Sequence, residues 1–537
     1  MIDIFPYEIL ISEKNNNLFC IKNDIISQKC IYPLNYFPLI KKNGLFNNYY
    51  NKKSLNLYLY PKSRLLYLNK LKQKIQTLNL ISPKYNKYCK CYPKTIVFKN
   101  ENNPILYNEI SKNYTITKIN ITDKKYMVYS HITLDNKFHA VSILHLLKEN
   151  NISSINDFYG PNLLYTDIDY QTSKELISNL NKYTLFRGTF KGNDLALKNF
   201  AYYLYLKMKK KFPNDYNYIP ETYILPKDKE IFLNTIGNYK ISKDNIWLIK
   251  PVASSRGRGI RLMTDINSIP EKTIMTHYIS NPYLINGKKF DLRLYLLITG
   301  YSPLKIYIYD NGLTRFCSEE YDLDINKMNN LYIHLTNYSI NKNSSKYEKN
   351  ENSEKEIGNK WTLQTLINHF KENKIDFEPC WKKICDIMIK TILSITDTAI
   401  PLIKKFNVTS CNLFEIYGVD ILLTDDLQPW LIEFNLNPSL NCDSELDLKI
   451  KSKLLTDIFN IVGLVPFTHN EKIQILDKEI IYKDYISEAV NEAICEFYRP
   501  SGGFIRIFPL KDNIKSYMKF FEKADEENKA LWNELLK

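Results

Sequence analysis

From about residue 125 onward, short apolar runs alternate with stretches whose apolar residues fall at helical spacing. The runs predict β-strands and the spaced stretches predict amphipathic helices. Strands are predicted at 126–134, 162–169, 221–226, 246–250, 288–299, 303–309, 313–317 and 502–509, and helices at 140–150, 194–211, 361–370, 379–400 and 444–461. Strands that alternate with helices indicate an α/β domain. Residues 1–120 mix Tyr, Asn and Lys turns with short strands and show no chemical motif.

Two of the predicted helices carry specific expectations. The helix at 194–211 presents an apolar face that includes Leu197 and Phe200, and lysines in its last turn complement the helix dipole. The helix at 379–400 should end at Pro401, because proline lacks an N–H and its ring clashes with the preceding turn.

Two apolar runs between residues 414 and 434 contain carboxylates, which are costly to bury in an apolar core. Phe414–Leu423 and Trp430–Phe434 flank a Thr-Asp-Asp turn, which predicts a β-hairpin buried on both faces. Asp420 lies inside the first run, Glu433 inside the second, and Asn435 directly after it. Residues two apart on a strand share a face, so these oxygen ligands can converge in a way that suits Mg²⁺. The alternative is a hairpin whose acids are capped by Arg or Lys.

A second unusual stretch begins where an apolar strand ends in Lys250. The loop SSRGRG at 254–259 follows, and another strand begins at Ile260. Small residues let backbone N–H groups approach phosphate oxygens, and Lys250 and Arg256 add positive charge. The Walker pattern is absent, and a strand rather than a helix follows the loop. The pattern therefore favours a flap over a nucleotide, with an ordinary basic hairpin as the alternative.

The strand predicted at 288–299 has one charged face. Lys289, Asp291, Arg293 and Tyr295 alternate with apolar residues. Such a face is either solvated or lines a cleft.

Composition narrows the class of protein. Of 537 residues, 44% are hydrophobic, enough for sizeable cores, and the net charge is +15, which calls for an anionic partner. Nucleic acid, membrane headgroups and acidic proteins all fit this charge, but basic–aromatic platforms that would favour nucleic acid are missing. The ten cysteines show no zinc spacing, and no secretory signal or membrane-length apolar run occurs, so we expect reduced thiols in the cytosol.

Several motifs, in order, resemble the tubulin–tyrosine ligase-like family, most closely its polyglutamylase branch. They are WLIKPVASSRGRG at 247–259, KFDLR at 289–293, HLTNYSINK at 334–342, FEIYGVD at 414–420 and PWLIEFNLNPSL at 429–440. The resemblance spans about 125–465. It implies an ATP-grasp fold, of α/β (α+β) class, with the nucleotide held between two mainly antiparallel sheets, an N-terminal α/β domain and a helical C-terminal tail.

The resemblance also implies roles for individual residues. Those expected to bind ATP are Lys250, Arg256, Gly257, Thr276, His277, Tyr278, Ile279, Lys289, Phe290, Asp291, Thr336 and Asn337. The expected Mg²⁺ ligands are Asp420, Glu433 and Asn435, and the expected contacts to the incoming amino acid are Arg256, Arg315, Tyr338, Ser339 and Lys451. Lys250, Arg256 and Glu433 would act in catalysis. Family members that start glutamate side chains have arginine at the position of Arg256, whereas members that extend them tend to have glutamine. The resemblance therefore implies that this chain starts side chains.

The implied function is ATP-dependent tubulin polyglutamylation: glutamate is joined to a tubulin-tail glutamate through an acyl phosphate. One alternative is a ligase of the same fold that adds glycine or tyrosine, or that modifies an acceptor other than tubulin. Another is a microtubule-binding protein whose catalytic site has decayed. The last is a basic protein that binds nucleic acid. Arg315 with Lys451 favours an acidic amino acid.

The expected domains are an extension at 1–120, an α/β domain at 121–245, a central ATP-grasp domain at 246–345, a C-terminal ATP-grasp domain at 346–465 and a charged helical tail at 466–537. We expect a monomer that binds tubulin tails and free glutamate but neither nucleic acid nor membrane. Its expected location is the cytoplasm and cytoskeleton, including the cilium or flagellar basal body.

Overall fold

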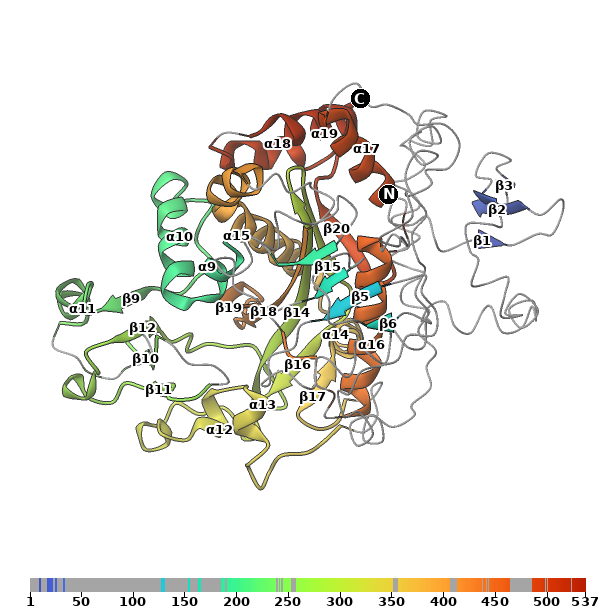
Figure 1. Ribbon diagram of the computed structural model, residues 1–537. Helices are drawn as coiled ribbons and strands as arrows, with labels where there is room; N and C mark the ends of the chain where they lie inside the picture. The colour runs from blue at the N-terminus through green and yellow to red at the C-terminus, as the bar shows by residue number, and fades with distance from the viewer. Residues whose placement is uncertain are drawn as a thin grey trace.

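The computed structural model describes residues 9–10, 17–22, 25–26, 32–33, 127–130, 153–154, 163–165, 185–188, 191–237, 240, 242, 245–252, 257–350, 356–405, 413–436, 438–440, 442, 444–463, 485–497, 499, 501–522 and 524–537. The helix predicted at 140–150 lies outside them. The described part contains one large sheet of twelve strands, a four-stranded sheet beside it, and helices on both faces of the large sheet (Figure 1). It is therefore α+β.

The large sheet is organised around β14 (Lys288–Tyr301), which forms antiparallel ladders with three strands: β15 (Leu304–Tyr309), β16 (Leu313–Phe316) and β18 (Leu413–Leu423). The remaining antiparallel strands are β13 (Leu284–Ile285), β17 (Lys360–Thr362), β19 (Pro429–Leu436) and β20 (Phe504–Phe508). Four parallel strands continue from β18: β8 (Leu185–Arg187), β7 (Leu163–Tyr165), β5 (Met127–Ser130) and β6 (Ser153–Ser154). The strands predicted at 288–299, 303–309 and 313–317 are confirmed.

Side chains alternate along β14, so its two faces have different partners. Leu292, Leu294 and Leu296 belong to the larger core, together with residues of α15 (Glu378–Lys405). Tyr295 and Leu297 point the other way and pack with residues of α16 (Glu445–Val462). Burial of each such apolar side chain stabilises the fold by roughly 1.5–3 kcal/mol. Lys289, Asp291 and Arg293 share the face of Tyr295, so the charged face ends where α16 begins to cover the strand.

The four-stranded sheet has the order β11-β10-β12-β9 and is antiparallel throughout. Its strands are β9 (Thr222–Leu225), β10 (Trp247–Lys250), β11 (Arg261–Leu262) and β12 (Thr273–His277). Trp247, Ile249 and Met275 form its small core with Phe232 of α11 (Lys229–Ile236). The two strands predicted on either side of the Gly-rich loop are therefore confirmed, while residues 253–256 of the loop lie outside the described residues.

The helix predicted at 194–211 is wrong in its continuity and in part of its apolar face. It is two helices, α9 (Gly192–Ala196) and α10 (Lys198–Lys211), because Leu197 is extended, with φ −78° and ψ 110°. The break turns α10, so Leu197 and Phe200 are 45% and 48% exposed. Leu195 and Met208, which the predicted face also includes, are buried, and Tyr202 and Tyr205 are buried in place of Leu197 and Phe200.

Two helix ends also differ from expectation. Trp361 lies in β17, and α14 (Leu363–Glu372) begins after Thr362, whose Oγ1 accepts a hydrogen bond from the Thr365 N–H at 2.9 Å. The prediction that Pro401 ends α15 is wrong, since the helix continues to Lys405. Packing overrides the missing N–H, because Ile403 is buried in the core and Lys404 Nζ donates to Glu527 at 2.9 Å.

The C-terminal segment is part of the same structure. β20 pairs with β15, and α17 (Tyr485–Phe497) supplies the buried Glu496 carboxylate. Glu496 accepts hydrogen bonds from Thr299, Lys305 and Tyr307 at 2.5, 2.7 and 2.6 Å.

The other described helices are α12 (Leu331–His334), α13 (Tyr338–Asn341), α18 (Ile514–Tyr517), α19 (Glu526–Leu536) and the 3₁₀ turns Ile266–Ser268, Ile325–Lys327 and Met518–Phe520. A small separate sheet contains β1 (Ile9–Leu10), β2 (Asn17–Lys22), β3 (Ile25–Ile26) and β4 (Tyr32–Pro33). None of the helices in the described ranges has the length and apolar character needed to span a membrane.

Candidate functional site

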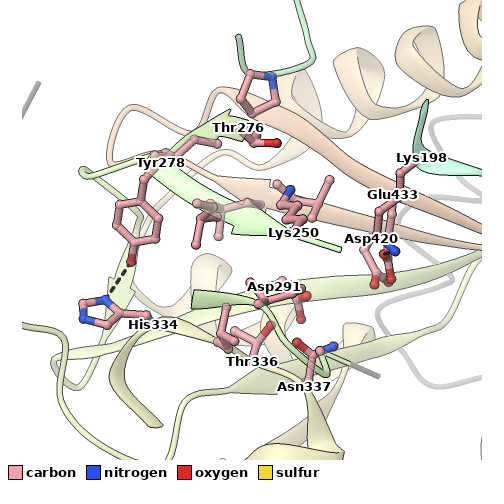
Figure 2. A pocket seen from close by; sticks show the side chains of 18 of the residues that line it. Lys198, Lys250, Thr276, Tyr278, Asp291, His334, Thr336, Asn337, Asp420 and Glu433 are labelled. Atoms are coloured by element: carbon pink, nitrogen blue, oxygen red, sulfur yellow. Dashed lines mark hydrogen bonds and ion pairs between the residues drawn. The ribbon is translucent and has the colours of Figure 1, made fainter. Parts of the chain in front are cut away.

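A pocket lies between the four-stranded sheet and the charged face of the large sheet; its empty space, which includes the solvent at its open mouth, is about 920 Å³. Figure 2 shows Tyr278 and His334 at one end, and Asp420, Glu433 and Lys198 at the other. Twelve of the predicted site residues line it: Lys250, Gly257, Thr276, His277, Tyr278, Ile279, Lys289, Asp291, Thr336, Asn337, Asp420 and Glu433. The tertiary structure thus brings together segments from residue 250 to residue 433.

The hairpin β18–β19 places the predicted metal ligands opposite one another. Asp420 is the cross-strand partner of Glu433, and Gly418 is the partner of Asn435. Ile432 is an extra residue in β19, because the register shifts between Asp420 and Ile421. The prediction of a hairpin is confirmed, but burial on both faces is wrong for β19: Ile432 is 36% exposed where the strand borders the pocket.

Asp420 is held by two arginines. Its Oδ1 accepts from Arg293 Nε at 2.5 Å and its Oδ2 lies 2.9 Å from Arg315 Nη2. Burial by itself would raise the pKa of Asp420, but the two guanidinium charges outweigh burial and hold the pKa well below its usual value. Gly418 makes room for this arrangement, because a Cβ there would lie 3.3 Å from Arg293 Cδ.

Glu433 has a weaker partner. Its Oε2 lies 3.7 Å from Lys198 Nζ, and a quarter of its side chain is exposed. Burial and the neighbouring Asp420 raise the pKa of Glu433, while Lys198 opposes the shift.

Two lysines form the positive interior of the pocket. Burial lowers the pKa of Lys250 and the pKa of Lys289 to about 8 each. Lys289 Nζ donates to Tyr278 Oη at 3.0 Å and lies 4.2 Å from the centre of that ring. Tyr278 Oη is also 3.0 Å from His334 Nδ1, and burial lowers the pKa of His334 to about 4. A polyanion in the pocket would favour the charged form of both lysines.

The Gly-rich loop reaches the pocket from the four-stranded sheet. Gly257 has a φ of 75°, and a Cβ there would meet Ile340 Cδ1 at 2.8 Å and Asn337 Oδ1 at 2.9 Å. Only glycine fits this contact between the loop and α13. Arg256 lies outside the described residues, so its roles remain predictions. Ser339 lines a separate hollow with Gly257.

Besides Ser339, five described residues of the predicted site do not line the pocket. The Phe290 side chain belongs to the core on the opposite face of β14. Asn435 lies beside the pocket, with its Nδ2 3.4 Å from the Gly418 carbonyl oxygen. Arg315 lies behind the pocket floor and is bonded to Asp291 and Asp420. Tyr338 and Lys451 belong to a neighbouring cluster with Lys360 and Asp447.

The sequence interpretation omitted several residues of this site. Arg293 was visible in the alternation along its strand but was given no role. Lys198 had no sequence signal, since its helix read as an ordinary amphipathic one. His334 lines the pocket and was quoted only as part of a motif. Lys360 and Asp447 come together only through the tertiary structure.

The donor set fits Mg²⁺ bound jointly with a phosphate ligand. Two carboxylates and an amide are hard oxygen donors, and Mg²⁺ commonly uses one or two carboxylates with substrate phosphates. Within the described ranges, no group of three His, Cys, Asp or Glu side chains could hold a metal ion. A site of this kind would therefore depend on a phosphate bound beside Lys250.

Comparison with known proteins places the chain in a family. The family described as "Tubulin-tyrosine ligase family" matches residues 177–472. Similar proteins include tubulin polyglutamylase TTLL5 of Homo sapiens, 42% identical over 254 residues, and tubulin monoglutamylase TTLL4 of Mus musculus, 35% identical over 262 residues. These matches cover 47% and 48% of this chain, and 19% and 22% of those proteins.

A probable beta-tubulin polyglutamylase of Tetrahymena thermophila is 34% identical over 370 residues, which cover 64% of this chain and 30% of that protein. The chain thus spans between about a fifth and a third of the length of these curated relatives. The family match covers more than half of the chain and includes both strands of the hairpin and the whole pocket. The chain belongs to the tubulin-tyrosine ligase family.

Proposed function

We propose that the chain is an ATP-dependent tubulin polyglutamylase with an ATP-grasp fold. It would join the amine of free glutamate to the γ-carboxylate of a glutamate in a tubulin tail. The observation that carries this proposal is the pairing of Asp420 with Glu433 across the hairpin, at the end of a two-sheet pocket that contains Lys250 and Lys289. The names of the similar glutamylases support the choice of substrates.

In this proposal the pocket binds Mg·ATP. Thr276 to Ile279 would hold the adenine, while Lys250, Lys289 and Arg256 would bind phosphate oxygens. Asp291, Thr336 and Asn337 line the pocket floor and would make further contacts. Asp420, Glu433 and Asn435 would hold Mg²⁺, which when bound neutralises charge on the phosphates. Because Arg293 and Arg315 bond both Asp420 oxygens, metal binding would require these pairs to rearrange.

The reaction has two steps. A carboxylate oxygen of the acceptor attacks the γ-phosphorus of ATP and ADP leaves, which gives an acyl phosphate. The amine of glutamate then attacks the acyl carbon, loses a proton and expels phosphate, which forms an isopeptide bond. Lys250 and Arg256 would stabilise the developing negative charge, and the Gly-rich loop would exclude water from the acyl phosphate.

Arg315, Tyr338, Ser339 and Lys451 would bind the incoming glutamate. A guanidinium can form two parallel bonds to one carboxylate. Arg256 would favour initiation of side chains over their extension. The net charge of +15 is complementary to that of acidic tubulin tails, and the names of the tubulin-modifying relatives support a cytoskeletal location.

The test is incubation of the purified chain with ATP, Mg²⁺, microtubules and one labelled amino acid at a time, followed by mass spectrometry of the tubulin tails. Glutamate should be incorporated on internal glutamates. Incorporation of glycine or tyrosine without glutamate would overturn the proposal.

A variant tests the role of Glu433. Glu433→Gln should abolish incorporation and leave microtubule binding intact, while the exposed Glu372→Gln serves as the control. Unchanged turnover of Glu433→Gln would refute the metal site.

A further inference from the structure

The cross-strand register forms two charged rows across the large sheet. Lys360 of β17 lies opposite Arg315 of β16, and Arg315 lies opposite Asp291 of β14. Two residues further along β14, Arg293 lies opposite Asp420. Directly opposed residues share a face of the sheet. Lys360 is therefore on the pocket's face, one strand beyond Arg315 and on the side away from Glu433.

A buried carboxylate from another element reaches Lys360. Asp447, in the first turn of α16, is completely buried. Its Oδ2 lies 2.9 Å from Lys360 Nζ, and its Oδ1 lies 2.9 Å from Lys451 Nζ one helical turn further on. Ser444 Oγ donates to the same carboxylate at 2.9 Å. Asp447 thus connects a lysine of the sheet with a lysine of the helix.

Both lysines are near groups of the candidate site. Lys360 Nζ lies 4.0 Å from the centre of the Tyr338 ring. Lys451 acts electrostatically on Tyr295, which is two residues beyond Arg293 on the same face of β14. The two ammonium groups and the guanidinium of Arg315 therefore gather on the same side of the sheet. Such a site suits a carboxylate ligand.

We propose that Asp447 is a positioning residue that fixes the ammonium groups of Lys360 and Lys451 beside Arg315, where together they bind a carboxylate of the incoming amino acid. This inference rests on the proposed ligase function. Asp447 does not touch the substrate. It acts through the two lysines.

The electrostatics of the cluster agree with this geometry. Burial would lower the pKa of Lys451, but Asp447 outweighs burial and raises it, with smaller contributions from Tyr295 and Cys442. Burial would raise the pKa of Asp447, but Lys451 and Lys360 lower it to about 2. Without the carboxylate, burial and mutual repulsion would favour a neutral lysine.

The test is Asp447→Asn, with the KM for glutamate measured from pH 6.5 to 9. The wild-type KM should change little with pH, because Lys451 stays charged. The KM of the variant should rise by up to about tenfold per pH unit above the lowered lysine pKa. Its affinity for Mg·ATP, measured by calorimetry, should stay within about twofold of wild type. Lys360→Gln, which keeps the Asp447–Lys451 pair, should raise the KM for glutamate at every pH.

Asp457→Asn is the matched control. Asp457 lies on the same helix and bonds Tyr309 Oη and the Gly503 N–H, both at 2.9 Å. Its loss should lower Tm without changing the KM for glutamate. If Asp447→Asn behaves like Asp457→Asn, or raises the KM for ATP and glutamate equally, the inference is wrong.

The two proposals fail differently. If the wild type ligates another amino acid, the glutamylase proposal is wrong, and the same variants measured with that amino acid still test Asp447, since every amino acid carries a carboxylate.

Discussion

Two neighbouring carboxylates, Asp420 and Glu433, have very different surroundings. The Asp420 side chain is 3% exposed and is bonded to two arginines, whereas the Glu433 side chain is 25% exposed and has one lysine at 3.7 Å. The role in metal binding that we propose for both residues therefore coexists with different structural roles. A residue-by-residue comparison can separate loss of activity from loss of stability.

Asp420→Asn and Glu433→Gln should both lower ligation by at least about 100-fold, because each removes a proposed metal ligand. Asp420→Asn should also destabilise the fold by roughly 3–5 kcal/mol, since it leaves buried arginine charge unpaired. Glu433→Gln should change stability by less than about 1 kcal/mol. Urea unfolding, followed by circular dichroism, measures the stability of each variant. Equal stability of the two variants would show that the ion pairs of Asp420 with the two arginines contribute nothing to the free energy of unfolding.

The buried lysines predict a pH dependence of nucleotide binding. Lys250 and Lys289 have pKa values near 8 in the folded protein, against an ordinary value of 10.5. The cost of burying their charges is therefore present below pH 8 and falls as the pH rises toward 10.5. ATP restores the charges, so binding at pH 9 should take up about one to two protons. Calorimetry in buffers of different ionisation enthalpy measures this uptake, which Lys289→Met should reduce. Binding without proton uptake would contradict it.

At the scale of elements, the Gly-rich loop meets α13 through a glycine. The sequence indicated a loop that approaches phosphate, but the contact with Asn337 and Ile340 appears only when the two segments pack. The hairpin itself, by contrast, was predictable, because two short runs joined by a tight turn leave few alternatives, whereas the extra residue at Ile432 appears only in the structure. Helix 194–211 was misread since apolar spacing alone does not reveal an extended residue at Leu197.

Gly257→Ala should weaken ATP binding by about tenfold or more, because the new Cβ would strike Ile340 and Asn337 at a positive φ. Gly237→Ala is the matched control: its φ is also positive, at 50°, but nothing lies within 4 Å of the new Cβ. That variant should lose about 1 kcal/mol of stability without a change in ATP affinity. Similar ATP affinities of the two variants would exclude a role for the loop contact.

At the scale of the whole molecule, the fold continues beyond the family match, which ends at residue 472. Lys305 is completely buried, and its ammonium group bonds Glu496 of α17. The core of the large sheet therefore depends on a segment for which the sequence predicted a charged helical tail and a strand at 502–509, but no role in the core. That dependence could not be read from sequence, because 191 residues separate the two partners.

A chain that ends at residue 472 should fail to fold, because β15 would lose β20 and Lys305 would keep a buried, unpaired charge. Glu496→Gln in the full chain should cost roughly 3–5 kcal/mol. Glu534→Gln, which removes a partner from the exposed Lys537, should cost less than about 1 kcal/mol. Thermal unfolding measures all three proteins. A soluble, cooperative fold of the shortened chain would contradict the prediction.

The sequence by itself determined the strands around Lys250, the central strand, the hairpin and the carboxylates within it. These features depend on period-two alternation and short turns, which act over a few residues. Only the tertiary structure decided which charges pair. Arg293 and Arg315 hold Asp420, Lys198 faces Glu433, and Asp447 joins two lysines. The reason is physical: an ion pair depends on distance in space, and nothing in local sequence spacing encodes the crossing of remote strands and helices.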